Sequence, residues 1–155
     1  MPVKDTDLNE IQAKMSPLFG QQAWGVALGE GSFITLEFGA SRPTTRPRER
    51  QHGEWHLWVY CCAWRLDEND DVIAASEDAR TKLEAAVQRL NGLTLRAVDI
   101  RSPAFETMLT FDKGITLHLF PVFSELYEHW MLYTPDGSVL TIGPGTSWSY
   151  ERSSN

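Results

Sequence analysis

The chain has little cysteine, with only the neighbouring Cys61 and Cys62 among its 155 residues. Successive side chains of a strand point to opposite faces, so these two thiols diverge, and a bond between them would need a strained ring. There is no C-x-x-C pair and no second cysteine cluster that could hold zinc. We therefore exclude redox chemistry by a cysteine pair. Both thiols are predicted to be reduced, to lie on opposite faces of a strand and to be at least largely buried.

Long apolar runs are also missing. No run approaches the roughly 18 residues that a membrane helix needs, and the N-terminal MPVKDTDLNEIQAKM lacks the apolar region of a secretory signal. A cytoplasmic protein without membrane contact is therefore expected. Basic residues are outnumbered, since 14 Lys and Arg against 21 Asp and Glu give a net charge of −7. This balance disfavours nucleic-acid binding and would suit a basic protein partner.

The remaining composition is that of a globular protein. Hydrophobic residues make up 42% of the chain and include six tryptophans, which is enough to bury one core. Residues 1–155 are predicted to form a single domain. Residues 40–52, ASRPTTRPRERQH, contain four arginines and two prolines and show no apolar periodicity. This segment is predicted to be a flexible loop.

Two segments have helical periodicity. DTDLNEIQAKM, residues 5–15, predicts a short amphipathic helix that ends before a proline and a glycine. SEDARTKLEAAVQRLNG predicts a middle helix over about 76–91, with Ser76 as its N-cap and Gly92 just after its end. The residues expected on the buried faces are Leu8, Ile11 and Met15 in the first helix and Leu83, Val87 and Leu90 in the second.

About eight strands account for most of the rest. They are predicted at residues 23–28, 32–38, 55–66, 93–100, 105–111, 115–123, 129–133 and 138–143. The turn signals DKG and PDG make the second half a series of hairpins, and short hairpins imply antiparallel pairing. The predicted class is α+β, with a large, mostly antiparallel sheet and the middle helix packed on it. An open sheet, a sandwich and a barrel are all compatible with this pattern.

The longest predicted strand, Trp55–Leu66, has no charged face, so both of its faces should be at least partly covered. One face would carry Trp55, Leu57, Val59, Cys61 and Ala63, and the other His56, Trp58, Tyr60, Cys62 and Trp64. Aromatic rings with polar atoms can stack on a sugar, a base or a proline, so the second face is a candidate ligand site. Alternatively, it forms a second layer of core.

Candidate catalytic residues are sparse. His56 and His118 could meet across strands with Glu37, and such a trio would form a metal or acid–base site. Histidines on strands are, however, more often structural, and no H-E-x-x-H or G-x-S-x-G motif is present. We therefore predict neither a bound metal nor a cofactor and assign no catalytic residue. The candidate ligand-binding residues are His56, Trp58, Tyr60, Trp64, Glu37 and His118.

Two charged features bear on possible partners. Glu37 lies in an apolar strand, so it should either point to solvent or pair with Arg65 or a histidine. An acidic turn follows the longest strand, and its candidate partner-binding residues are Asp67, Glu68, Asp70 and Asp71. Such a turn could steer a basic partner or merely keep the loop solvated.

The second half of the chain also carries a resemblance. LNGLTLRAVDI, LTFDKGITLHLFP and HWMLYTPDGSVLTIGPG resemble the helix-then-hairpins pattern of small uncharacterised bacterial proteins. Some of those are grouped by genome context with immunity proteins, which neutralise polymorphic toxins. The resemblance implies a bacterial binding protein without enzymatic activity and assigns no functional residue. We therefore expect a small acidic, immunity-like module that binds a protein. The alternative is a small-molecule-binding or catalytic domain that uses the aromatic face with His56, His118 and Glu37.

Overall fold

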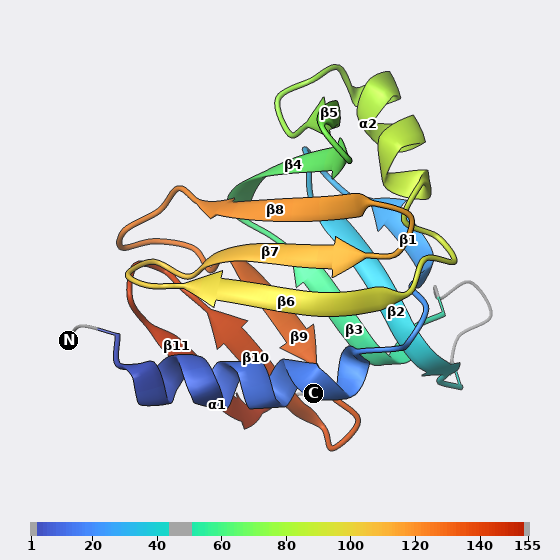
Figure 1. Ribbon diagram of the computed structural model, residues 1–155. Helices are drawn as coiled ribbons and strands as arrows, with labels where there is room; N and C mark the ends of the chain where they lie inside the picture. The colour runs from blue at the N-terminus through green and yellow to red at the C-terminus, as the bar shows by residue number, and fades with distance from the viewer. Residues whose placement is uncertain (1–2, 44–50, 154–155) are drawn as a thin grey trace.

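The computed structural model describes residues 3–43 and 51–153. Two antiparallel sheets of six and five strands form two layers, and two helices lie at different ends of the molecule (Figure 1). Neither sheet closes on itself. The α+β class and the antiparallel pairing are therefore confirmed, and the expected large sheet is two open sheets.

In the described part of the chain the two sheets contain eleven strands rather than about eight. The six-stranded sheet consists, in spatial order, of β1 (Trp24–Leu28), β2 (Ile34–Ser41), β3 (Gly53–Val59), β9 (Trp130–Tyr133), β10 (Ser138–Ile142) and β11 (Trp148–Arg152). The five-stranded sheet consists of β5 (Asp71–Ala75), β4 (Cys62–Glu68), β8 (Ile115–Pro121), β7 (Glu106–Phe111) and β6 (Leu95–Arg101). The count differs because the predicted strand 55–66 is two strands and because β5 and β11 were not predicted.

The predicted strand 55–66 is interrupted at Tyr60 and Cys61, where the chain leaves one sheet and enters the other. Buried positions are odd-numbered in β3 and even-numbered in β4, so the alternation of faces restarts at this corner. The residues that face the core are Leu57, Val59, Cys62, Trp64 and Leu66. The predicted single aromatic face was therefore wrong, because Trp64 lies in the core and Trp58 does not.

Helix α1 (Asp5–Met15) has the predicted bounds and lies across one end of the two layers (Figure 1). It touches both sheets. The Gln12 side-chain amide donates a 2.9 Å hydrogen bond to the Val98 carbonyl in β6, and the Lys14 ammonium lies 4.3 Å from the centre of the Tyr150 ring in β11. The predicted buried residues Ile11 and Met15 are fully enclosed, and Leu8 is partly buried against the core.

Helix α2 (Arg80–Gln88) begins four residues later and ends three residues earlier than predicted. Ser76 does not cap it. Instead, Ser76 donates its N–H to the Trp64 carbonyl at 2.8 Å and accepts the Trp64 N–H on its hydroxyl at 3.1 Å, which extends the pairing of β5 with β4. The predicted stripe of Leu83, Val87 and Leu90 is buried. The Arg80 guanidinium donates to the carbonyls of Gly29 and Gly31, so α2 is held against the β1–β2 turn.

The core lies between the sheets and contains buried side chains from both. Trp130 of β9 is 1% exposed, and its indole N–H donates a 3.1 Å hydrogen bond to the Thr107 hydroxyl of β7. This bond joins the two layers and satisfies a polar atom that burial would otherwise leave unpaired. Within the described residues, no helix has the length and apolar character needed to span a membrane.

Both cysteines are free, as predicted. Cys62 is 6% exposed, and burial raises the pKa of its thiol to about 12. Cys61 is only partly buried, because it lies in the corner between β3 and β4. The predicted loop 40–52 begins and ends as expected near the ends of β2 and β3, but its residues 44–50 lie outside the described part of the chain.

Candidate functional site

The six candidate ligand residues lie in four separate places. Glu37 and His56 are direct partners on neighbouring strands of the six-stranded sheet, and Trp58 and Tyr60 lie further along β3 and the corner that follows it. Trp64 is part of the core, where its indole N–H donates to the Ser32 carbonyl at 2.7 Å. His118 lies on β8 in the other sheet, so the expected meeting of His56 and His118 does not occur.

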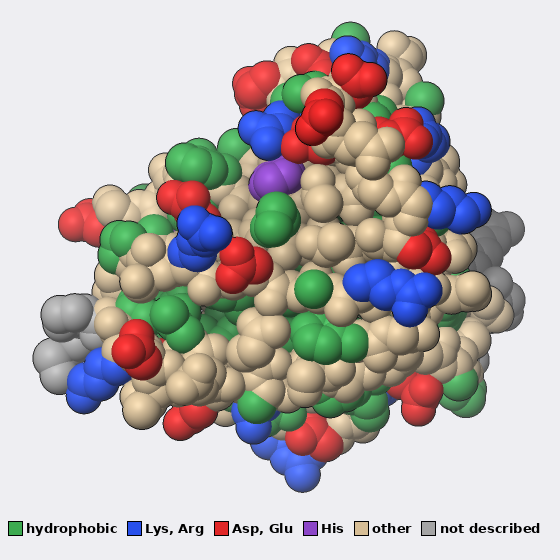
Figure 2. Space-filling view, viewed as in Figure 1, with side chains coloured by type: hydrophobic (Ala, Val, Ile, Leu, Met, Phe, Trp, Pro, Cys, Tyr) green, Lys and Arg blue, Asp and Glu red, His purple; other side chains and the backbone are tan. Residues whose placement is uncertain are grey.

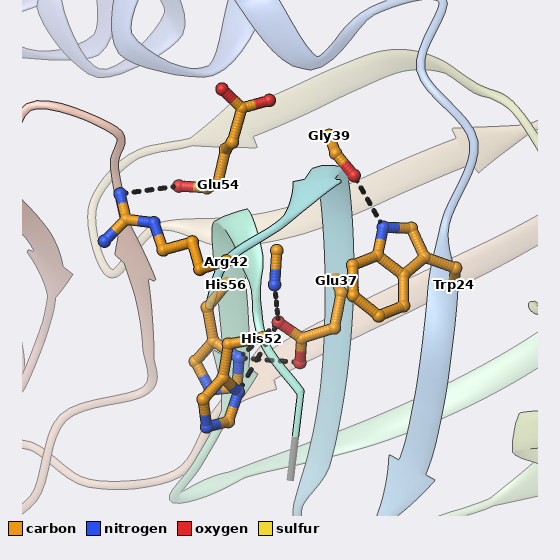
Figure 3. Close-up of polar contacts among 8 residues, drawn as sticks. Trp24, Glu37, Gly39, Arg42, His52, Glu54 and His56 are labelled. Carbon is orange, nitrogen blue, oxygen red and sulfur yellow. Dashed lines mark hydrogen bonds and ion pairs between the residues drawn. The ribbon is translucent and has the colours of Figure 1, made fainter. Parts of the chain in front are cut away.

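Glu37 pairs with histidine, one of the two outcomes expected for it (Figure 3). Its carboxylate oxygens lie 2.9 and 2.7 Å from Nδ1 of His56, and its Oε1 accepts the Gly53 N–H at 2.9 Å. The Glu37 side chain is 1% exposed, although it lies on the side of β2 away from the core residues. A carboxylate buried this completely is stabilised by the polar groups that converge on it.

His52 is the third member of this cluster. Its Nδ1 lies 3.6 Å from Oε1 of Glu37, and its ring packs edge-on against that of His56 with centroids 4.6 Å apart. The backbone N–H of Arg42 donates to the His52 carbonyl at 2.7 Å, which fixes His52 at the base of the 40–52 loop. His52 was not among the predicted site residues, because it lies at the end of a loop rather than on a strand and reaches the carboxylate from there.

Local backbone features explain why Glu37 is enclosed. Gly25 of β1 has φ +58°, and a Cβ there would lie 3.2 Å from the Glu37 side chain. A Cβ on Gly53 would collide with the Phe38 carbonyl oxygen. Glycine at these two positions therefore lets β1 and β3 approach the carboxylate closely. Trp24, the neighbour of Glu37 on β1, donates its indole N–H to the Gly39 carbonyl at 2.8 Å (Figure 3).

A three-ring aromatic cluster replaces the predicted aromatic face. Phe33 takes the place that was expected for Trp64. The Tyr60 ring centroid lies 4.9 Å from that of Phe33 and 4.7 Å from that of Trp58. All three side chains are partly exposed. The pKa of Tyr60 is raised, first by the charge of the neighbouring Cys61 thiolate and then by burial.

On the five-stranded sheet, His118 takes part in a different polar group. Its Nε2 lies 3.1 Å from Asp67, whose carboxylate also accepts two hydrogen bonds from Arg65 at 2.8 and 2.9 Å. The hydrogen bond from Arg65 lowers the pKa of Asp67. An open cleft of about 250 Å³ lies beside His118 and is lined on its other side by residues of β6 and β7. Arg65 therefore pairs with Asp67 rather than with Glu37.

The acidic turn is only partly free. Acidic side chains gather at the end of the molecule formed by β4, β5 and α2 (Figure 2). Of the four predicted partner-binding residues, Asp67 is engaged as above, and Glu68 forms a 2.9 Å ion pair with Arg89. Asp70 and Asp71 are exposed. These last two are the residues available to an approaching partner.

A second surface, unmarked by any sequence motif, lies at the end of β8 and on the connection between β8 and β9. Its exposed large hydrophobic side chains form what we call the apolar patch, which consists of Phe120 (55% exposed), Val122 (56%), Phe123 (38%), Leu126 (65%) and Tyr127 (51%). Five such residues within eight positions are unusual, because scattered single hydrophobic residues are the normal surface pattern. The Phe123 and Tyr127 rings pack edge-on with centroids 5.2 Å apart.

The backbone beneath the apolar patch is held by hydrogen bonds from two neighbouring segments. The Tyr60 and Cys61 N–H groups donate to the carbonyls of His129 and Glu128 at 3.0 and 3.2 Å, and the Gly145 N–H donates to the Phe123 carbonyl at 3.2 Å. These bonds come from the β3–β4 corner and from the β10–β11 connection. The exposed side chains are therefore presented from an ordered backbone, as binding surfaces commonly are.

His129 anchors the far end of this connection. It is 1% exposed, its Nε2 lies 3.4 Å from the Phe123 carbonyl oxygen, and its ring packs against Gly143, where a Cβ would lie only 2.7 Å away. Its Nδ1 is buried without a hydrogen-bond partner. Burial lowers the pKa of His129, so the neutral ring is favoured.

Comparisons with protein-family models, curated proteins and solved structures found no match to this chain. Two features of the described residues could therefore carry a function, the Glu37–His52–His56 cluster and the apolar patch.

Proposed function

We propose that the protein is a small acidic interaction module that binds a protein partner through the apolar patch at the end of β8 and on the β8–β9 connection. The observation that carries this proposal is the exposure of five large hydrophobic side chains on a hydrogen-bonded backbone. Exposed apolar patches of this kind mark interaction surfaces, because leaving them in water is unfavourable. The resemblance of the second half of the chain to immunity-type bacterial proteins favours the same class of function.

The backbone of Tyr127 supports a functional reading of the patch. This residue has φ +66°, a left-handed conformation that costs a bulky residue about 1–2 kcal/mol. Tyr127 is 51% exposed and its ring packs against that of Phe123, so burial in the folded chain repays only part of that cost. Strain held at an exposed aromatic residue is typical of binding sites, where it presents a side chain to a partner.

The charge around the patch selects the kind of partner. Residues 114–151 contain no Lys or Arg, and the β8–β9 connection itself carries Glu125 and Glu128. Figure 2 shows hydrophobic, acidic and basic side chains along the edge of the molecule where this connection lies, and Arg101 lines the same cleft as Phe120. A second copy of the chain would bring like charges together in a symmetric contact. The partner is therefore a different protein, with an apolar surface surrounded by Lys and Arg.

Photo-crosslinking tests this proposal. A photoreactive residue placed at Leu126 should join the protein to one discrete partner in its native cells, and the same residue at Val72 should not. Val72 is the matched control, because it is 61% exposed against 65% for Leu126 but lies on β5, away from the patch. Equal crosslinking from both positions, or crosslinks only to a second copy of the chain, would refute the proposal.

A further inference from the structure

We propose that Glu37, His52 and His56 form a binding site for a divalent transition-metal ion, with zinc as the ion that suits them best. This inference goes beyond the proposed partner binding and does not depend on it. One carboxylate oxygen and one ring nitrogen from each histidine lie within 4.8 Å of one another. Within residues 3–43 and 51–153, this is the one group of three potential metal-ligating side chains that converge in this way.

The chemistry of the three groups matches zinc. Imidazole nitrogen and carboxylate oxygen are both zinc ligands, and two histidines with one glutamate are a known zinc-binding set. At bond lengths of about 2.0–2.2 Å, ligand atoms on a tetrahedral ion lie roughly 3.3 Å apart. The 3.6 Å between His52 Nδ1 and Glu37 Oε1 is already close to that separation. The 2.7 Å between His56 Nδ1 and Oε2 would have to widen by roughly 0.6 Å, within reach of side-chain rotation.

The surroundings of the cluster fit a metal site as well as its ligands do. The Gly53 N–H, which donates to Oε1 of Glu37, would orient the carboxylate in the way that outer hydrogen bonds orient metal ligands. Nδ1 of His52 is buried, faces the carboxylate and has no hydrogen-bond partner, so a bound ion would satisfy it. The side chains of His52 and His56 are 42% and 17% exposed, against 1% for Glu37, so solvent reaches the cluster from the histidine side.

The competing explanation is that Glu37 and His56 are only a structural pair, with His52 beside them by chance. A metal titration separates the two. The probe is Zn²⁺ added to the untagged full chain after chelation, followed by isothermal titration calorimetry, with Co²⁺ used in parallel for its visible absorption spectrum. We expect one ion per chain and a cobalt spectrum of low coordination number.

His52→Ala is the decisive variant, because the ring is 42% exposed and its Nδ1 makes no hydrogen bond, so the fold should tolerate its loss. Removing a direct ligand should weaken zinc affinity on the order of 100-fold or more, since even outer-shell changes cost 10–100-fold. The control is His118→Ala, which removes a histidine that is 33% exposed on the other sheet and should leave affinity unchanged. Circular dichroism confirms that each variant is folded.

Three results would overturn the proposal. They are no stoichiometric zinc binding by the unaltered chain, unchanged affinity in His52→Ala, and equal losses in His52→Ala and His118→Ala. None of these outcomes involves the partner, so failure of the metal site and failure of the proposed function are distinguishable.

Discussion

Replacing Glu37 with alanine is expected to lower the free energy of unfolding by about 3 kcal/mol, which follows from its hydrogen bonds. The change leaves the buried Gly53 N–H without its 2.9 Å acceptor, at a cost of about 1–3 kcal/mol. It also removes the acceptor of the His56 ring, and hydrogen bonds to charged groups contribute about 1.5–3 kcal/mol. The variant also no longer bears the free-energy cost of burying a charged carboxylate, which offsets part of this loss.

Urea unfolding followed by tryptophan fluorescence measures this effect. With a slope of about 2 kcal/mol per molar urea, a loss of 3 kcal/mol moves the midpoint down by roughly 1.5 M. Glu37→Gln is the matched control. Its amide oxygen can still accept the Gly53 N–H and its amide nitrogen can face His56, so the expected loss is about 1 kcal/mol.

A double-mutant cycle with His56→Ala tests whether the two side chains act together. Directly interacting residues show coupling energies of about 0.5–3 kcal/mol, so the double variant should lose less stability than the two single variants added together. Strict additivity, or a loss below about 0.5 kcal/mol for Glu37→Ala, would refute the assignment of Glu37 as a buried, hydrogen-bonded group.

Three further outcomes are expected. In native thiol labelling followed by mass spectrometry, Cys61 should react before Cys62, whose raised pKa of about 12 and burial block thiolate formation until unfolding. The folded pKa of His129 lies below the ordinary value of 6.5, so the neutral ring should contribute fully to stability above pH 6.5 and progressively less below it. His129→Phe should therefore reduce the difference in melting temperature between pH 7.5 and pH 5.5. Once the partner is purified, the double variant Asp70→Asn, Asp71→Asn should associate with it more slowly and with a weaker dependence on salt, at an unchanged melting temperature. Asp67→Asn should in addition lower the melting temperature, because it breaks the ion pair with Arg65.

The local elements were predictable from the sequence. Helix α1 has the predicted bounds, and the hairpins of the second half follow the turn signals DKG and PDG, where Lys113, Gly114 and Gly137 have positive φ. The stripe of α2 was also correct, because helical periodicity records which face is buried. The start of α2 was predicted wrongly. Ser76 precedes acidic residues and therefore resembles an N-cap in sequence, but its hydroxyl bonds to the neighbouring strand β4 instead of to the helix.

The missed features depend on contacts distant in sequence. Nothing in VYCCAW marks a turn, so the corner at Tyr60 and Cys61 is specified by packing between the sheets rather than by local residues. β5 and β11 were missed because they are short strands at sheet edges. The sequence indicated that Glu37 could pair with a histidine. It did not indicate His52, because the position of His52 beside Glu37 depends on the path of the connection between β2 and β3.

The most direct test of the proposed function is a measurement of binding affinity by calorimetry, with the partner that crosslinking identifies purified in free form. The chains to compare are the unaltered protein, Leu126→Ser, Tyr127→Ser and Val72→Ser. We predict that each of the two changes in the apolar patch weakens binding at least about 10-fold, since central interface residues contribute more than about 1.4 kcal/mol. Val72→Ser should leave the affinity unchanged. Unchanged affinity in both patch variants, or an equal loss in Val72→Ser, would contradict this prediction.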